Sequence, residues 1–279
     1  MILLEGKKLS EEILENIKKE IEENNLKLRL AIILIGKNSS SELFIKQKEK
    51  ACKNVGIDFK LFKFGIDIDF DKLKKEINRI CKDKNNSGVV VQLPLPNKFK
   101  NKEQEILNLI PSRKDPDVLS QESLAKFLTD DSFIMPPVVR ATSYLFYKYG
   151  INPKGKNVVI IGSGKLVGLP LSLWMIKKYA TVSIINKFTK DISFFTKKSD
   201  ILICGVGRPK VVIGSMTKKG IVVVDVGISF RKGKIIGDVD FKTVSKKAGY
   251  ITPVPGGIGP LTVVSLLENL VKLNKNNYK

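Results

Sequence analysis

The sequence predicts an α/β protein with two lobes around a cleft, the second lobe being a Rossmann-like doubly wound parallel sheet. Helical and strand-like segments alternate along the chain, which is typical of this architecture. In the second half a glycine-rich turn joins a strand to a helix, as in doubly wound sheets that hold nucleotides. The 279 residues exceed one average domain, and 43% of them are apolar, which is enough for a substantial core.

The elements of the first lobe follow from the spacing of its apolar residues. Ser10 is expected to cap a helix whose apolar residues, such as Ile13 and Ile17, recur at helical spacing. Two more helices are expected over residues 41–55 and 71–82. Apolar or alternating runs predict strands over residues 30–35, 57–61 and 88–91.

The second lobe is expected to begin after Met135-Pro136-Pro137, where the composition changes. We therefore expect one lobe over residues 1–137, completed by a C-terminal helix within residues 261–279, and another over residues 138–260. Buried runs predict strands in the second lobe over residues 157–161, 181–185, 201–204 and 221–226. Helices are expected over residues 166–179 and 261–273.

The composition excludes several classes of protein. The chain has no histidine, which excludes catalytic triads and metal sites that depend on this residue. Its three cysteines lie far apart, so neither a disulfide framework nor a zinc site is expected, and no metal is assigned. No apolar run reaches the roughly 18 residues of a membrane span, and the first residues turn charged too early for a signal peptide. We expect a cytoplasmic protein without membrane contact.

The net charge of +21 raises the alternative of a non-catalytic nucleic-acid-binding protein. Of the 49 basic residues, 43 are lysine and 6 are arginine. Because arginine is preferred for base edges and bidentate phosphate contacts, this bias favours a general lysine-rich composition over a nucleic-acid site. The alternative predicts binding that falls steeply with salt.

The clearest binding motif is the glycine loop that follows the expected strand over residues 157–161. It reads Gly162-Ser163-Gly164-Lys165-Leu166-Val167-Gly168, and a helix follows it. Such a loop lets the backbone approach a diphosphate at a helix N-terminus, whereas the simpler reading is a tight turn. No acidic residue stands directly after the next expected strand, residues 181–185, where NAD-binding proteins usually place one for the ribose hydroxyls. Asn186, Lys187 and Lys190 stand there instead, which favours the 2′-phosphate of NADP over NAD.

Three polar residues of the first lobe are candidates for chemistry. Lys48 falls on the apolar face of its expected helix, where burial would lower its pKa, although its ammonium could instead reach solvent. Gln92 ends a buried strand, where open α/β sheets form ligand crevices. Asp117 lies on a proline-rich loop, as a turn residue or as a carboxylate that contacts a polar heterocycle.

Together these residues carry a family resemblance. The sequence resembles methylenetetrahydrofolate dehydrogenase/methenyltetrahydrofolate cyclohydrolases nearly from end to end. Its segment Ser41-x-x-Phe44-x-x-x-Lys48-x-Lys50-Ala51 is similar to the family's Ser-x-x-Tyr-x-x-x-Lys-x-Lys-Ala helix. The longest similar motifs are GVVVQLPLP at residues 88–96 and ITPVPGGIGPLT at residues 251–262. Shorter similarities join Lys114–Asp117 to KDVDG, Gly162–Pro170 to GRSxxVGxP, and Val224–Ile228 to IDVGI.

The resemblance implies a folate-binding lobe and an NADP-binding lobe, with the pterin in the cleft beside the nicotinamide. A hydride would pass from 5,10-methylenetetrahydrofolate to NADP, and water would convert the methenyl product to 10-formyltetrahydrofolate. The implied partners are tetrahydrofolate derivatives, including polyglutamylated ones, and a second copy of the chain in a homodimer formed through the nucleotide-binding lobe.

The resemblance also implies roles for individual residues. Lys48 would handle protons in the hydrolytic step, Gln92 would steer its protonation, and Asp117 would hold the amide edge of the pterin. The implied substrate-binding residues are Phe44, Leu93, Pro255, Gly256 and Gly257. The implied cofactor-binding residues are Gly162, Ser163, Gly164, Lys165, Lys187, Ile228 and Thr262.

Several positions depart from the family pattern. Phe44 replaces the family's tyrosine, so a dehydrogenase with weak or no cyclohydrolase activity is an alternative. Ser163 replaces an arginine that contacts the 2′-phosphate. Lys187 or Lys165 is a candidate to take over that contact, and NAD stays an alternative cofactor. Val118 stands where KDVDG has glycine.

Overall fold

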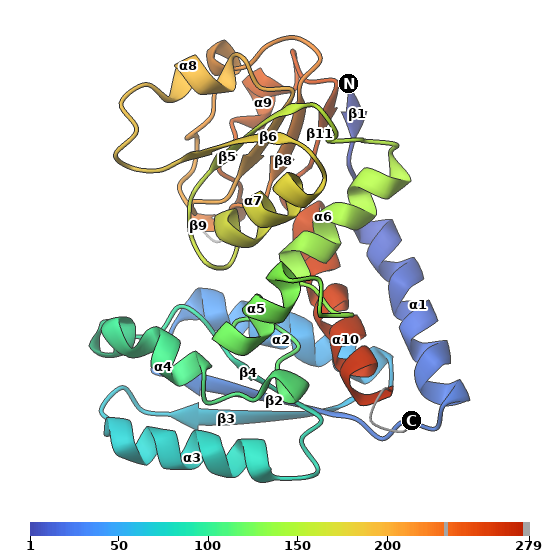
Figure 1. Cartoon of the computed structure of the whole chain (residues 1–279), viewed down its shortest axis with the longest axis vertical. Coiled ribbons are helices and arrows are strands. Elements are labelled where there is room, and N and C mark those ends of the chain that lie inside the picture. Colours follow the sequence, from blue (N-terminus) through green and yellow to red (C-terminus); the bar gives the residue numbers. More distant parts are fainter. Residues whose placement is uncertain (232–233, 276–279) are drawn as a thin grey trace. The chain divides into compact units, whose positions relative to one another are not determined.

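The computed structural model describes residues 1–231 and 234–275 (Figure 1). The strands are β1 (Ile2–Leu3), β2 (Arg29–Ile35), β3 (Asp58–Phe64), β4 (Gly88–Val91), β5 (Asn157–Ile161), β6 (Thr181–Ile185), β7 (Ile201–Cys204), β8 (Val222–Asp225), β9 (Ser229–Arg231), β10 (Lys234–Ile236) and β11 (Tyr250–Ile251). The α-helices are α1 (Lys7–Glu23), α2 (Ser39–Asn54), α3 (Phe70–Lys82), α4 (Glu103–Leu107), α5 (Gln121–Leu128), α6 (Pro137–Lys148), α7 (Gly168–Lys177), α8 (Ile192–Thr196), α9 (Phe241–Val244) and α10 (Ile258–Lys275). Short 3₁₀ helices are η1 (Asn97–Lys102), η2 (Ser112–Lys114) and η3 (Gly214–Met216).

The chain folds into two compact units. The six-stranded unit contains residues 1–10 and 138–262, and the three-stranded unit contains residues 11–137 and the chain from Val263 onwards. The structure therefore places the first ten residues with the second half of the chain, whereas the sequence assigned them to a lobe of residues 1–137. The reason is that β1 pairs in parallel with β11, so this short strand completes a sheet built by residues far away in the sequence. Residues 276–279 of the expected C-terminal helix lie outside the described residues.

The six-stranded unit is a doubly wound parallel sheet with the strand order β1-β11-β8-β7-β5-β6. Its strands pair in parallel from edge to edge. On one face α8 and α9 cover a core that includes Val159, Leu202 and Val223. On the other face α7 packs against β5 and β6, and Phe146 of α6 contacts Trp174 of α7. The α/β class and the Rossmann-like sheet are confirmed.

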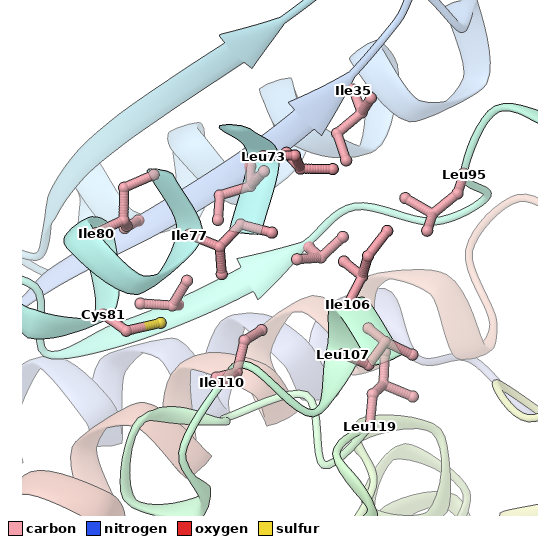
Figure 2. Packing of buried hydrophobic residues seen from close by; sticks show 14 of the residues in the cluster. Ile35, Leu73, Ile77, Ile80, Cys81, Leu95, Ile106, Leu107, Ile110 and Leu119 are labelled. Carbon is pink, nitrogen blue, oxygen red and sulfur yellow. The ribbon is translucent and has the colours of Figure 1, made fainter. Parts of the chain in front are cut away.

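The three-stranded unit is built on a parallel sheet with the order β3-β2-β4. The apolar stripe of α3 packs on one face of this sheet, against alternate residues of β2 and β4 (Figure 2). The labelled core residues of Figure 2 are Ile35, Leu73, Ile77, Ile80, Cys81, Leu95, Ile106, Leu107, Ile110 and Leu119. The opposite face is covered by α2, which carries Lys48 (Figure 1).

Two expected helix ends differ in the structure. The first helix begins at Lys7, and the Ser10 hydroxyl donates to the Lys7 carbonyl within it. Ser10 is therefore not the cap, because the Gly256 carbonyl accepts hydrogen bonds from the N–H groups of Gly6 and Lys7 at this helix end. The helix expected over residues 166–179 spans only Gly168–Lys177. Within the described residues, none of the helices has the length and apolar character required to cross a lipid bilayer.

Candidate functional site

Helix α2 presents a lysine on its buried face. Asn38 caps the helix by accepting a hydrogen bond from the Ser41 N–H. The buried residues of α2 are Ser41, Ile45, Lys48, Ala51 and Cys52. Lys48 is only 9% exposed, whereas the neighbouring lysines of the same helix are exposed, as the helical period predicts. The interpretation that Lys48 reaches solvent is therefore not supported.

The Lys48 ammonium contacts the end of β4. Its Nζ donates to Gln92 Oε1 over 3.0 Å in a buried hydrogen bond. Gln92 Nε2 in turn donates to the Leu93 carbonyl over 2.8 Å, which holds the amide with its oxygen towards Lys48. Both residues are less than one-tenth exposed. Two residues that lie 44 positions apart in the sequence thus form one polar pair.

Burial sets the electrostatics of this pair. Removal from water lowers the pKa of Lys48, and the charge of nearby Asp117 opposes part of this shift. For Asp117 burial raises the pKa, and the charge of Lys48 counteracts it. The structure thus places Asp117 within electrostatic reach of Lys48. A lysine with a lowered pKa is suited to exchange a proton near neutral pH.

Asp117 lies on a loop that side chains hold from within. The buried carboxyl group of Asp115 accepts hydrogen bonds from the N–H groups of Leu119 (3.0 Å) and Ser120 (2.8 Å). Val118 has a φ of +57° and is completely buried. A β-branched residue rarely adopts this left-handed conformation, and the strain costs about 1–3 kcal/mol. Valine at the position of the family's KDVDG glycine therefore keeps the backbone shape that glycine would favour.

Phe44 lies one helical turn before Lys48 and faces the same side of α2. It is only half-buried, whereas its neighbour Ile45 is buried. Leu93 is also half-buried, and its carbonyl accepts a second hydrogen bond from the Ser41 hydroxyl over 3.4 Å. Ser41, which the sequence analysis did not single out as a site residue, thus helps to join α2 to the end of β4.

The six-stranded unit holds the glycine loop at the carboxyl end of β5. Gly162 has a φ of +109°, and a Cβ on it would lie 2.7 Å from the Gly205 carbonyl oxygen. A Cβ on Gly168 would overlap the Gly162 carbonyl, so helix α7 can start this close to the strand only with glycine there. Neither the N–H of Ser163 nor that of Gly164 donates to a backbone carbonyl in the described part of the chain. These two groups are therefore available to an anion.

A buried carboxyl network supports the neighbouring loops. Asp238 Oδ2 accepts hydrogen bonds from the N–H groups of Val206 (2.6 Å) and Gly207 (3.0 Å), just after β7. Asp225, at the end of β8, accepts from the N–H groups of Gly227 and Asp238. Burial raises the pKa of Asp225 to about 7. The network fixes the loops that follow adjacent strands, where open α/β sheets bind ligands.

The other predicted site residues of this unit, Ile228, Pro255, Gly256, Gly257 and Thr262, lie after β8 and around the start of α10. Ile228 follows β8, and its carbonyl lies beside Gly207. The Gly256 carbonyl accepts hydrogen bonds from Gly6 and Lys7, next to the predicted substrate residues Pro255 and Gly257. The Thr262 hydroxyl donates to the Ile258 carbonyl within α10 over 3.1 Å.

The two lysines predicted to contact phosphate are exposed. Lys165 lies on the glycine loop. Lys187 follows β6, and its Nζ lies 4.9 Å from the centre of the Phe188 ring. Their predicted role at the 2′-phosphate rests on their charge and on their positions in the sequence.

Comparison with known proteins decides the family. Residues 4–117 match the catalytic domain of tetrahydrofolate dehydrogenase/cyclohydrolase, and residues 136–278 match its NAD(P)-binding domain. The chain belongs to the tetrahydrofolate dehydrogenase/cyclohydrolase family. Its first matched domain contains Lys48, Gln92 and Asp117, and its second contains the glycine loop.

Relatives within this family extend over the whole chain. The chain is 44% identical to the bifunctional protein FolD of Aquifex aeolicus over 283 aligned residues, which cover 99% of this chain and 96% of the relative. The solved structure of the bifunctional enzyme FolD from Campylobacter jejuni is 39% identical, covers 99% of both chains and superposes with a TM-score of 0.93. The Trypanosoma brucei enzyme, solved in complex with NADP and an inhibitor, is 28% identical, covers 100% of this chain and 99% of its own, and has a TM-score of 0.94.

Sequence reasoning missed the residues that support the site from a distance. Asp115, Asp225, Asp238 and Asn269 are buried polar residues, and each bonds to backbone groups of a loop near a predicted site residue. Asp115 lies in the KDVDG-like segment and Asp225 in the IDVGI-like segment, but no local spacing shows what these residues contact. The partners of Asn269 lie 134 and 153 residues away.

Proposed function

We propose that this protein oxidises 5,10-methylenetetrahydrofolate to 5,10-methenyltetrahydrofolate with NADP and then hydrolyses the product to 10-formyltetrahydrofolate. The observation that carries the proposal is the buried hydrogen bond between Lys48 and Gln92, with Asp117 in electrostatic reach, in a chain of this family. Its relatives are bifunctional proteins, and one of them was solved with NADP.

The glycine loop fits the cofactor. Gly162 and Gly168 allow the tight turn from β5 into α7, where a Cβ would collide with backbone, and the N–H groups of Ser163 and Gly164 can donate to the diphosphate. The exposed ammonium of Lys187 or Lys165 would contact the 2′-phosphate that distinguishes NADP from NAD. When bound, NADP supplies the acceptor for the hydride.

The oxidation requires placement more than acid or base catalysis. The methylene carbon gives up a hydride and becomes part of a methenyl cation, with no proton transfer in the step. The contribution of this chain is therefore to hold the folate in one orientation. The Asp117 carboxylate would accept hydrogen bonds from the amide edge of the pterin, and the Phe44 ring would stack on the folate.

The hydrolysis requires proton transfers. Water adds to the methenyl carbon and loses both of its protons as its oxygen becomes the formyl carbonyl, the bond from this carbon to N5 breaks, and N5 gains one proton, so one proton is released in total. A neutral Lys48 amine can accept the proton from water and return it to N5. The lowered pKa of Lys48 makes this amine available, and Gln92 Oε1 directs it by accepting one of its N–H bonds.

Turnover of 5,10-methylenetetrahydrofolate by the purified protein, with NADP and NAD compared, tests the proposal. We expect NADP to be reduced faster than NAD, without lasting accumulation of the methenyl product. A preference for NAD would contradict the cofactor assignment. Reduction of neither cofactor would overturn the proposed function.

Phe44 favours one alternative, a dehydrogenase with weak or no cyclohydrolase activity, because it lacks the hydroxyl of the family's tyrosine one turn before Lys48. Accumulation of the methenyl product beyond its spontaneous hydrolysis would indicate this alternative. A Phe44→Tyr variant would then hydrolyse the product faster than the unmodified protein. If the variant and the unmodified protein hydrolyse it equally fast, the missing hydroxyl does not limit the reaction.

We further propose that the protein acts in the cytoplasm as a homodimer formed through the six-stranded unit. Strand β6 lies at the edge of the sheet, and Ile184 on it is 41% exposed. Such an edge can pair with another chain. The three cysteines are free and buried, which suits a reducing compartment. Light scattering on the purified protein would test the dimer, and a monomeric mass at micromolar concentration would contradict it.

A further inference from the structure

Helix α10 contributes a buried asparagine to the loop that carries Asp117. Asn269 is completely buried, and its Nδ2 donates to two backbone carbonyls, that of Pro116 over 2.9 Å and that of Met135 over 2.8 Å. Both carbonyls belong to the three-stranded unit, as does Asn269. Pro116 immediately precedes Asp117, so this hydrogen bond acts on the peptide group from which Asp117 extends.

The side-chain hydrogen bonds that Asp115 makes in this loop fix residues after Asp117. The Asp115 carboxyl group binds the N–H groups of Leu119 and Ser120, which fixes the end of the loop. Val118 holds a left-handed conformation, and its N–H donates to the Asp115 carbonyl over 3.3 Å. The peptide before Asp117 is held from outside the loop by Asn269.

The Asn269 amide makes its hydrogen bonds through its N–H donors and not through its oxygen. Its Oδ1 is buried and has no hydrogen-bond partner among the described residues. A buried acceptor without a partner is destabilising. The side chain therefore contributes to the fold chiefly through the two hydrogen bonds that it donates, one of which ends next to Asp117.

We propose that Asn269 is a positioning residue for folate binding, which orients Asp117 through the Pro116 carbonyl. This inference rests on the proposed function, in which Asp117 holds the pterin. Without the Asn269 amide, the Pro116 peptide can rotate and Asp117 loses its fixed direction. The folate then binds less tightly, while the cofactor site in the other unit keeps its own supports.

An Asn269→Leu variant tests this, because leucine has a similar volume and no donors. Asn274→Leu is the matched control. Asn274 lies on the same helix, and its Nδ2 donates to the backbone carbonyls of Ser87 (3.2 Å) and Leu270 (2.8 Å), neither of them near Asp117 in the sequence. We expect Asn269→Leu to raise the KM for methylenetetrahydrofolate by about tenfold or more, which is the effect of losing a charge-assisted contact. The KM for NADP in this variant, and both KM values in the control, should change by less than about twofold.

A double-mutant cycle separates orientation of Asp117 from general loosening. If Asn269 acts through Asp117, adding Asn269→Leu to an Asp117→Asn variant raises the folate KM little further. If Asn269→Leu and Asp117→Asn instead raise the folate KM independently, so that their effects multiply in the double variant, the inference is overturned. It is also overturned if Asn274→Leu raises the folate KM as much as Asn269→Leu does. Should Asn269→Leu fail to fold, Asn269→Asp keeps the volume, removes the amide donors and is expected to give the same order of folate KM values.

Turnover by the unmodified protein separates a failure of the positioning role from a failure of the proposed function. If it reduces NADP with methylenetetrahydrofolate but Asn269→Leu leaves the folate KM unchanged, only the role of Asn269 is wrong. If the unmodified protein shows no turnover, the proposed function fails, and the positioning role fails with it.

Discussion

The two units of this protein build their candidate sites from different groups. In the three-stranded unit the site consists of side chains that are buried and bonded to one another, Lys48 to Gln92 and Gln92 to the backbone of Leu93. In the six-stranded unit it consists mainly of backbone at the glycine loop, with exposed lysines around it. Buried side-chain networks have few alternative arrangements, whereas exposed lysines can change without disturbing the fold. The chemistry of the first unit is therefore more tightly specified than the cofactor choice of the second.

The largest expected effect concerns the buried lysine. A Lys48→Met variant should lose about 10²–10⁴-fold in hydrolysis of the methenyl product, because general acid–base catalysis contributes this much. Hydride transfer should continue, since it needs no proton. Coupled absorbance measurements of NADPH and of the methenyl product would separate the two steps. Lys46→Met, which changes an exposed lysine on the same helix, should leave both rates intact.

The next effect concerns the backbone of the glycine loop. Gly168→Ala forces a Cβ onto the Gly162 carbonyl and should weaken NADP binding by about tenfold or more, because the helix start must move. Gly164→Ala is the comparison: it lies in the same loop, but no atom lies within 4 Å of the Cβ it would add, so it should weaken NADP binding less. Titration with NADP would show the contrast. Equal binding by the two variants would mean that the close approach at Gly168 is not what shapes the cofactor site.

A smaller effect is expected at the exposed lysine after β6. Lys187→Gln should raise the KM for NADP by about fivefold, because one exposed phosphate contact contributes about 1 kcal/mol. The KM for NAD should not change. Lys178→Gln, which replaces another exposed lysine of the same unit, is the control. An unchanged KM for NADP in Lys187→Gln would assign the phosphate contact to another residue, with Lys165 as the next candidate.

The smallest expected effect is on stability and depends on pH. The folded state lowers the pKa of Lys48, so between that lowered value and the unfolded value of about 10.4 the unfolded chain binds more protons. The contribution of Lys48 to stability therefore rises with pH in this window. Near pH 7 the Lys48→Met variant should be more stable than the unmodified protein, and the gap should narrow towards pH 10. Denaturant unfolding at both pH values would measure it, and a constant gap would contradict the assignment.

The contrast between the units also shows what the sequence could predict. Helical period places Lys48 on the buried face, and the strand–turn–helix order identifies the glycine loop, because both signals are local. The start of α1 at Lys7 was missed, since the group that satisfies its first N–H groups is the carbonyl of Gly256, about 250 residues away. The same holds for the bonds of Asn269 to Pro116 and of Asp238 to Val206.

Strand β1 pairs with β11, and α10 is divided between the two units after residue 262. This arrangement has a consequence for synthesis on the ribosome. The chain passes between the units after residues 10, 137 and 262, so each unit combines an early segment with a late one. The three-stranded unit lacks the second part of α10 until nearly the whole chain has been made. Domains of multidomain proteins often fold one after another as they emerge. In this protein neither unit has all of its residues until the late segments have been made, so the units cannot fold one after another during synthesis. In stalled nascent chains we therefore expect protease-resistant structure to appear late, and in both units together.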